Sequence, residues 1–496
     1  MDALASLVAG FGVILTPENL YFCLLGSLIG TLVGVLPGLG PLAAMALLLP
    51  VTFTLTPVAG MVMLASIFYG AMYGGSTTSV LLNIPGEAAS VVTCIDGHQM
   101  ARQGRAGAAL GIAALGSFVA GTVGVVVMTF FAPAIAAIAI RFGPPENFAL
   151  MVLGLVCTLY MITGSPVKGA LMIALGFLGA AVGIDVVNGQ ERFTFGSINL
   201  TGGLDLLAVV IGLFGVTEVL ANVETLTHGS LLTGRIRNLW PTVDDWRASW
   251  RPILRGSGLG FILGLVPGGG PVTASFMSYA LEKRLSDTPQ RFGKGAIEGV
   301  AGPESANNAA VAGSMIPILS LGIPGNPVTA LLLGALIIHG IQPGPLFVVQ
   351  RPDLFWGIVA SMYLGNVFLL ILNLPLVGLW AQLLRVPYHI LFPVVLLLCV
   401  VGTYSANKNV FDLWVMLGFG VAGHVLRKLE YDLAPFVIAF VLAPLMEQSL
   451  RQSLVMSPDG AMILVQRPAA AILLAISALL VVLMLGRKSA NGGGTS

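Results

Sequence analysis

Small polar side chains gather at two places in an otherwise apolar chain, and each lies ahead of an Ile-Pro-Gly sequence. The first is GGSTTSVLLNIPG at residues 74–86, and the second is GPESANNAA at 302–310, ahead of GIPG at 322–325. Hydroxyl and amide groups bind anions through hydrogen bonds, together with the backbone N–H groups of helix N-termini, which carry partial positive charge. The two segments therefore indicate a site that holds a carboxylate without arginine.

Two other interpretations of these polar residues stay open. Ser and Thr in membrane helices also bond to their own backbone or hold helices together. A carboxylate at membrane depth is costly and is a functional hypothesis by default, which makes Glu87 and Glu304 candidates. At a membrane interface the same two carboxylates would carry no such meaning.

The polar side chains of the two segments must be positioned by helices, and the sequence indicates that these helices are interrupted. GSLIGTLVGVLPGLGP at 26–41 and GSGLGFILGLVPGGGP at 256–271 share eight of sixteen residues at an offset of 230, and LLNIPGEAAS at 81–90 resembles SLGIPGNPVT at 320–329 at an offset of 239. Proline inside a helix removes a backbone hydrogen bond, and glycine admits unusual φ values. We expect four interrupted elements that meet near mid-membrane, while the glycines at every fourth residue form a packing face.

Composition places most of the chain in lipid. Of 496 residues, 56% are hydrophobic and 9% are charged, whereas a soluble domain has about 25% charged residues. We expect an all-α polytopic membrane protein with about twelve transmembrane helices in two inverted repeats, with broken helices and re-entrant hairpins. The net charge of +1 gives no electrostatic reason to expect nucleic acid as a partner. Membrane lipid is an expected partner.

The repeat offsets and the loop charges divide the chain. Residues 1–225 are the expected first inverted repeat, 226–255 a cytoplasmic linker rich in arginine, 256–486 the second repeat and 487–496 a flexible polar tail. The segment 96–105 carries two arginines and 339–351 carries one, which favours opposite orientations of the two halves. The N-terminus lacks a basic leader and a cleavage site, and we expect a retained short or interfacial helix.

Signatures of catalysis are missing from the sequence. It contains no GxxxxGK[ST] phosphate loop and no GxSxG elbow, and no Gly-rich dinucleotide fingerprint follows an expected strand. Its four cysteines and five histidines show no metal-binding spacing, so we expect no metal and no cofactor. Secondary transport, rather than an enzyme activity, is the remaining prediction.

Five motifs in order carry a resemblance to a known family. They are GVLPGLGP, YGGSTTSVLLNIPGEAAS, DGHQMARQGRAGAALG, GLVPGGGP, and GPESANNAAVAGSMIPILSLGIPG followed by HGIQPGP. Together they resemble the large membrane subunit of the tripartite tricarboxylate transporters, the TctA-like family. The resemblance implies a multi-pass permease of the bacterial inner (cytoplasmic) membrane that takes up di- and tricarboxylates, coupled to Na⁺ or H⁺. It also implies a small membrane subunit, a periplasmic solute-binding protein and an elevator-like movement.

By position, the resemblance implies a substrate or ion site with members in both halves. In the first half they are Ser76, Thr77, Thr78, Asn83, Pro85 and Gly86. In the second half they are Glu304, Ser305, Asn307, Asn308, Pro324, Gly325 and Asn326. The helix breaks expected to line the same cavity are Pro37, Gly38, Gly40, Pro267, Gly268, Gly269 and Gly270. A passive anion channel and a ligand-sensing membrane subunit are the alternative functions.

Overall fold

The computed structural model describes residues 3–36, 40–162, 165–185, 188–224, 238–384 and 388–491. These residues are almost entirely helical. The strands among them are Gly183–Ile184 (β1) and Glu191–Arg192 (β2), which pair antiparallel. Pro37 and Gly38 of the expected first helix break lie outside the described residues.

The helices fall into two runs along the chain. The first run consists of α1 (Ala3–Ile14), α2 (Pro17–Val35), α3 (Gly40–Thr52), α4 (Pro57–Leu82), η1 (Ala88–Ser90), α5 (Val91–Arg102), α6 (Ala106–Ala139), α7 (Pro144–Met161), α8 (Pro166–Ala180), η2 (Ile198–Leu200), α9 (Leu206–Val210), the π-helical η3 (Ile211–Val216) and α10 (Thr217–Glu224). The second run consists of α11 (Val243–Leu265), α12 (Gly270–Leu285), η4 (Pro289–Arg291), α13 (Glu298–Leu321), α14 (Pro327–Ile338), α15 (Phe347–Gln350), α16 (Pro352–Asn373), α17 (Val377–Leu383), α18 (Tyr388–Asn407), α19 (Val410–Lys428), α20 (Ala434–Met456), η5 (Gly460–Met462), α21 (Ile463–Gln466) and α22 (Pro468–Asn491).

Seven helices in the described part of the chain are long and apolar enough to cross a membrane, namely α2, α4, α6, α7, α16, α19 and α20. A bent pair, Gly460–Gln466 with Pro468–Met484, makes eight if it counts as one span. The chain is therefore an all-α polytopic membrane protein, as predicted. The count of about twelve also included apolar stretches such as 167–183 and 204–221, which form helices shorter than a span.

The glycines at every fourth residue pack two helix pairs closely, as the repeat predicted. A Cβ atom built on Gly30 of α2 would lie 2.4 Å from the carbonyl oxygen of Ile67 on α4. One built on Gly260 of α11 would lie 2.1 Å from that of Ala306 on α13. Such distances admit no side chain, so glycine is required for each pair to approach. The same relation holds at Gly26, Gly34, Gly256 and Gly264.

The helix breaks occur where the proline motifs predicted them. Helices α2 and α11 end at Val35 and Leu265, which are 230 positions apart, and the next helices begin at Gly40 and Gly270. Helices α4 and α13 end at positions 82 and 321, which are 239 positions apart. The two repeat offsets are therefore kept in the helix boundaries.

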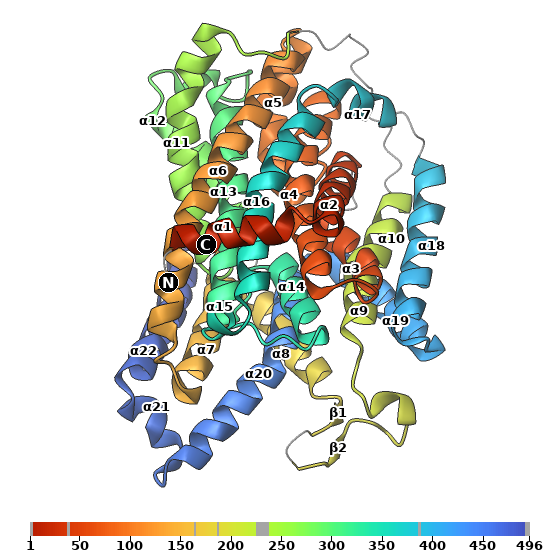
Figure 1. Cartoon of the computed structure of the whole chain (residues 1–496), viewed down its shortest axis with the longest axis vertical. Coiled ribbons are helices and arrows are strands. Elements are labelled where there is room, and N and C mark those ends of the chain that lie inside the picture. Colours follow the sequence, from red (N-terminus) through yellow and green to blue (C-terminus); the bar gives the residue numbers. More distant parts are fainter. Residues whose placement is uncertain are drawn as a thin grey trace.

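Helices α4 and α13 run antiparallel. Asp96, on α5 after the end of α4, accepts hydrogen bonds from the N–H groups of Gly293 (2.9 Å) and Gly295 (2.7 Å), just before α13 begins. At the other end, His339 Nε2 follows α14 and lies 3.4 Å from Thr52 Oγ1, just before α4 begins. Figure 1 shows α5, α11 and α12 at one end of the long axis, with α14 beyond the far end of α13. This arrangement supports an inverted relation between the halves.

The expected division into repeats, linker and tail stays a prediction. Helix α11 begins at Val243, so residues 243–255 of the expected linker belong to this helix. Helices α11 and α12 form the second hairpin, as α2 and α3 form the first. Helix α22 extends to Asn491, into the expected tail. Residues 225–237 and 492–496 lie outside the described part of the chain.

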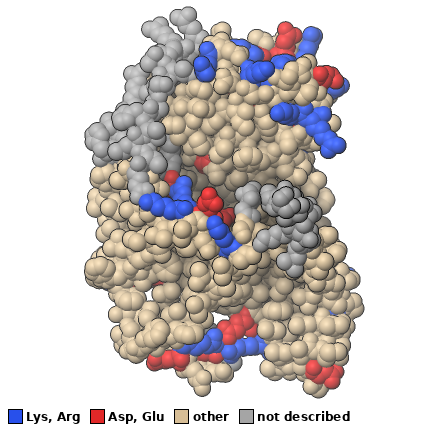
Figure 2. Space-filling view, turned by 180° about the vertical axis from the view of Figure 1, so that it is seen from behind, with Lys and Arg blue, Asp and Glu red and all other residues tan. Residues whose placement is uncertain are grey.

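Charged side chains are distributed unevenly over the surface. Figure 2 shows them at the two ends of the long axis and in one group at mid-height, with uncharged surface between these groups. An uncharged surface of this kind suits contact with lipid.

Candidate functional site

Glu304 on α13 lies where the two halves meet. Its side chain is 0% exposed. The hydroxyl of Thr93 on α5 donates to Oε1, and Asn307 Nδ2, one turn further along α13, lies 3.3 Å from Oε2. Ser76 on α4 lies beside this carboxyl group. Polar residues predicted from the two separate segments, Ser76, Glu304 and Asn307, therefore form one buried cluster.

A second branch of this cluster reaches α6. Asn308 Nδ2 donates to Ser117 Oγ at 2.8 Å and to Asn307 Oδ1 at 2.6 Å. Ser117 and Asn373 line a small cavity together with Ser76 and Thr77. The side chain of Ser305 is buried, and its Oγ has no hydrogen-bond partner among the described residues.

Glu87 lies beside this cluster, at the break after α4. It is 7% exposed and precedes η1, where its Oε2 accepts a hydrogen bond from the N–H of Ala89 at 2.6 Å. A Cβ atom built on Gly75 would lie 3.0 Å from Glu87 Cγ, so the carboxyl group sits on the α4 backbone next to Ser76. Both carboxylates singled out from the sequence are therefore buried.

Other predicted residues of the first half hold backbone in place. Thr78 donates to the carbonyl oxygen of Val35 at the end of α2. A Cβ atom on Gly86, which follows Pro85, would lie 1.9 Å from the carbonyl oxygen of Gly34. The break at 83–87 thus folds back against the end of α2, and Thr78 and Gly86 contribute packing there.

Asn83 has a conformational role. It ends α4 in the left-handed region, at φ 59°, and is exposed. The corresponding residue at an offset of 239 is Gly322, at φ 71°, which ends α13. Asn and Gly are the residues that adopt this conformation most readily at a helix end.

The second half repeats the arrangement between its hairpin and its break. Gly268 N, in the tip after Pro267, donates to the carbonyl oxygen of Gly325 at 2.7 Å. The side chain of Asn326, which follows Pro324 and Gly325, caps α14 by accepting from the N–H of Thr329 at 3.0 Å. Its Nδ2 is buried and has no partner among the described residues.

Glycine is needed in this second tip. Gly268 has φ +80°, and a Cβ atom on it would lie 2.6 Å from Thr158 Cα on α7. A Cβ atom on Gly269 would lie 2.0 Å from the carbonyl oxygen of Leu263. Gly270 (φ +54°) lies against Asn326, and its first-half counterpart Gly40 has φ +57°. The second tip, after Pro267, therefore contributes backbone.

Each hairpin also contacts the break of the opposite half. Helix α12, the second arm of the second hairpin, packs on η1, which follows the first break. Helix α3, the second arm of the first hairpin, packs on α14, which follows the second break. The two breaks therefore border the same central region between α4 and α13.

Sequence reasoning missed several residues of the cluster. Thr93, Ser117 and Asn373 lie outside the two polar segments at 74–86 and 302–310. Asn366 and Asn373, seven residues apart on the apolar helix α16, were a signal, because amides inside a membrane helix usually find a partner on another helix. Asn366 Oδ1 accepts from the hydroxyl of Tyr73 at 2.5 Å.

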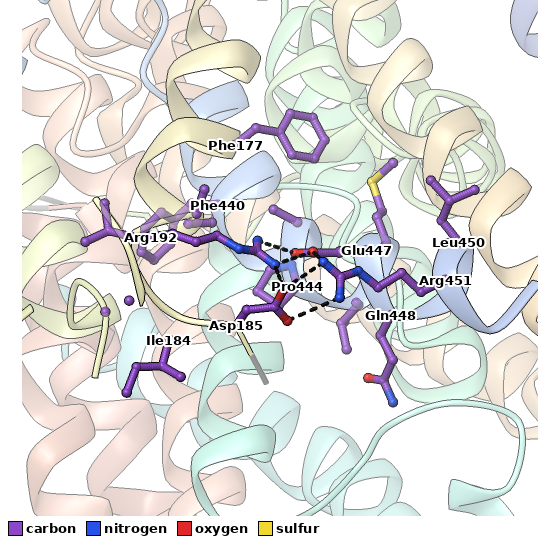
Figure 3. A pocket seen from close by; sticks show the side chains of 18 of the residues that line it. Phe177, Ile184, Asp185, Arg192, Phe440, Pro444, Glu447, Gln448, Leu450 and Arg451 are labelled. Carbon is purple, nitrogen blue, oxygen red and sulfur yellow. Dashed lines mark hydrogen bonds and ion pairs between the residues drawn. The ribbon is translucent and has the colours of Figure 1, made fainter. Parts of the chain in front are cut away.

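A large cavity lies elsewhere, between α7, α8, α20 and the β1–β2 hairpin, and has a volume of about 1190 Å³. None of the predicted site residues line it. Its charges neutralise one another: Arg192 and Arg451 both pair with Asp185 and Glu447 (Figure 3). The hydrogen bonds that Arg192 donates to Glu447 and Asp185 raise the pKa of Arg192. Because these arginines are already paired, we place the candidate site at Glu304.

Broken helices that surround buried polar groups, in two halves of opposite direction, are typical of secondary transporters. The model of the tripartite tricarboxylate transporter TctA family matches residues 20–438, and the chain belongs to this family. It is therefore a membrane subunit of a tripartite tricarboxylate transporter, which groups it with transporters rather than enzymes.

Two relatives from Agrobacterium vitis are similar over long stretches. One, described as an uncharacterized 52.8 kDa protein in the TAR-I ttuC' 3' region, is 50% identical over 485 residues, which cover 98% of this chain and 97% of the relative. The other, an uncharacterized protein in the TAR-II ttuC' 3' region, is 51% identical over 226 residues, which cover 46% of this chain and 93% of the relative. No solved structure gives a significant match.

Proposed function

We propose that this chain is the large subunit of an uptake permease for di- and tricarboxylates in the bacterial inner membrane, driven by a gradient of Na⁺ or H⁺. The observation that carries the proposal is the contact of Glu304 with Ser76 and Thr93, which joins polar groups of both halves inside the protein. A buried polar cluster between two inverted halves is where such transporters bind substrate and coupling ions. Membership of the TctA family supports the substrate class.

The substrate carboxylates would bind at the helix breaks. Helices α3, α12 and α14 begin there, at Gly40, Gly270 and Pro327, and their N-termini carry partial positive charge. Asn326 Nδ2 is a buried donor with no described partner, and Gly270 lies beside it. These N–H groups would replace the water of a carboxylate without an arginine in the site.

Alternating access would follow an elevator-like movement. The close packing of α2 on α4 and of α11 on α13 makes each hairpin and its long helix one rigid element. Helices α7, α8 and α20 form a separate packed group. The two hairpins, together with α4 and α13, would carry the site past the group formed by α7, α8 and α20. A small membrane subunit and a periplasmic solute-binding protein would complete the transporter, and the binding protein would deliver the substrate.

Counterflow tests this function. The chain would be reconstituted with its small membrane subunit, and uptake of labelled organic acids would be measured with the binding protein present, with and without Na⁺ and a pH gradient. We expect saturable counterflow of di- or tricarboxylates and accumulation that depends on one of the two gradients. Flux without saturation or ion dependence would favour a passive anion channel, and ligand-dependent change without counterflow would favour a sensing subunit.

A further inference from the structure

Two buried carboxyl groups from opposite halves lie against adjacent positions of α4. Glu87 packs on Gly75, and Glu304 lies beside Ser76. Both side chains are buried, and two nearby charges of the same sign repel each other strongly in a low-dielectric interior. The two groups come from segments more than 200 positions apart, and the antiparallel course of α4 and α13 brings them together.

No described cation neutralises this pair. Arg255 on α11 lies in the same region, but Glu282 on α12 binds it at two points, with Nε to Oε1 at 2.8 Å. Glu282 in turn packs on Gly302, two residues before Glu304. Among the described residues, the charged groups of this region, Arg255 and Glu282, are thus already paired with each other.

The other titratable groups on the surrounding helices are engaged or uncharged. Helix α6 has none in its sequence. Asp96 is held by backbone N–H groups and by Tyr279, and His98 Nδ1 contacts the carbonyl oxygen of Val80. The remaining groups on α4, α5, α12 and α13 are Tyr69, Tyr73, Cys94, Arg102, Lys283, Arg284 and Glu298, of which the three basic residues are exposed and lie in the last turns of α5 and α12.

The hydrogen bonds leave one oxygen atom open. Thr93 donates to Oε1 of Glu304 and Asn307 Nδ2 faces its Oε2, while the N–H of Ala89 donates to Oε2 of Glu87. Glu87 Oε1 is buried and has no partner in the described part of the chain. A proton on Glu87 Oε1 removes one charge and needs no further ligand.

We propose that Glu87 and Glu304 form a shared proton-binding site, which takes up one proton with the substrate and releases it to the cytoplasm. Two carboxylates so close in a low-dielectric interior cannot both keep their charge without a large penalty, so one of them holds a proton. An anionic substrate at the neighbouring breaks adds negative charge and strengthens proton binding. By linkage the proton then strengthens substrate binding equally, which is the relation that a symporter requires. This inference rests on the proposed function.

The test measures proton movement and exchange in the same vesicles. The complete transporter is reconstituted with a pH-sensitive dye inside, and a labelled dicarboxylate is added with the binding protein. We expect wild-type uptake to acidify the lumen. In Glu87→Gln and Glu304→Gln, the ratio of proton-driven accumulation to exchange falls about tenfold, within the usual range of coupling between sites. The control variant Glu430→Gln changes an exposed carboxylate that is distant in sequence from Glu87 and Glu304. Its ratio of proton-driven accumulation to exchange should match that of wild type.

The outcomes separate the two proposals. Proton-driven accumulation that persists in both Gln variants, or wild-type accumulation driven by Na⁺ without lumen acidification, overturns the proton site and leaves carboxylate transport standing. Absence of counterflow in the wild-type complex overturns the proposed function itself. If Glu304→Gln does not assemble, Glu87→Gln decides, because the only described donors to the Glu87 side chain lie within its own turn.

Discussion

The hydroxyl of Thr93, on α5 of the first half, donates a hydrogen bond to Oε1 of Glu304, on α13 of the second half. Both side chains are 0% exposed. A buried carboxylate that loses a donor retains its desolvation cost, so this bond stabilises the contact between the halves as well as the site. The predictions below separate residues that shape the site from residues that hold the helices together.

Replacing Thr93 tests the bond between the halves. Thr93→Val keeps the shape of the side chain but leaves Glu304 Oε1 without its donor, which should cost about 1–3 kcal/mol of stability. Thr93→Ser keeps the hydroxyl group and should retain most of the stability and uptake. Thermal unfolding of the purified complex, with uptake in parallel, measures both. Equal behaviour of the two variants would mean that the hydroxyl group is unimportant.

Asn307→Ala should abolish uptake while the protein still reaches the membrane. The change removes the amide that faces Glu304 Oε2 and accepts from Asn308. Membrane content is measured by immunoblot and uptake in proteoliposomes. Normal transport by this variant would remove Asn307 from the site.

Asn83→Ala is also expected to abolish uptake with membrane expression retained, and the structure indicates a conformational reason. Alanine in the left-handed region costs about 1–2 kcal/mol, and the break that carries Glu87 would shift. Asn83→Gly, which adopts this conformation freely, is the matched control and should transport. If the glycine variant is as inactive as the alanine variant, the Asn83 side chain itself is required.

Two glycines on α11 test the packing of the hairpin. Gly260→Ala would place Cβ 2.1 Å from the Ala306 carbonyl oxygen, whereas Gly258→Ala has no atom within 4 Å. Overpacking at position 260 should cost about 1–3 kcal/mol, while alanine at 258 should be neutral or stabilising by about 0.5–1 kcal/mol. In thermal unfolding, the midpoint temperature should therefore fall for Gly260→Ala. For Gly258→Ala it should stay the same or rise.

Asn326 separates helix capping from substrate binding. Asn326→Asp keeps the acceptor for the N–H of Thr329 but replaces the free Nδ2 donor with a negative charge, so KM for a dicarboxylate should rise by about tenfold or more, which is about 1.4 kcal/mol. Asn326→Ser keeps the cap without the charge and should raise KM less. An unchanged KM in the Asp variant would show that no carboxylate approaches this residue.

The sequence predicted the parts of the structure that depend on local chemistry. Proline and glycine motifs located the end of α2 at Val35 and the break at 266–269, because they determine backbone conformation within a few residues. The glycine face was predictable from its spacing of four. The polar segment around Ser76 and the one around Glu304 were visible because polar residues are rare in this chain.

Contacts between distant segments could not be predicted in this way. Thr93 and Ser117 look like ordinary helix residues, and only the packing of α5 and α6 on α13 gives them a role. Asp96 accepts hydrogen bonds from three backbone N–H groups of residues 293–296, about 200 positions away, and no motif predicts that arrangement. The apolar stretch 167–183 forms the helix Pro166–Ala180, whose 15 residues are fewer than a membrane span requires.

The location of bound substrate tests the central claim most directly. A cryo-electron microscopy map of the complete transporter with a dicarboxylate would be determined in lipid nanodiscs. We predict density between the two breaks, with carboxylate oxygens within about 3.5 Å of Ser76 or Thr77 and of Asn308 or Asn326. Density in the cavity of Arg192 and Arg451, with the region around Glu304 unaltered, would contradict the account.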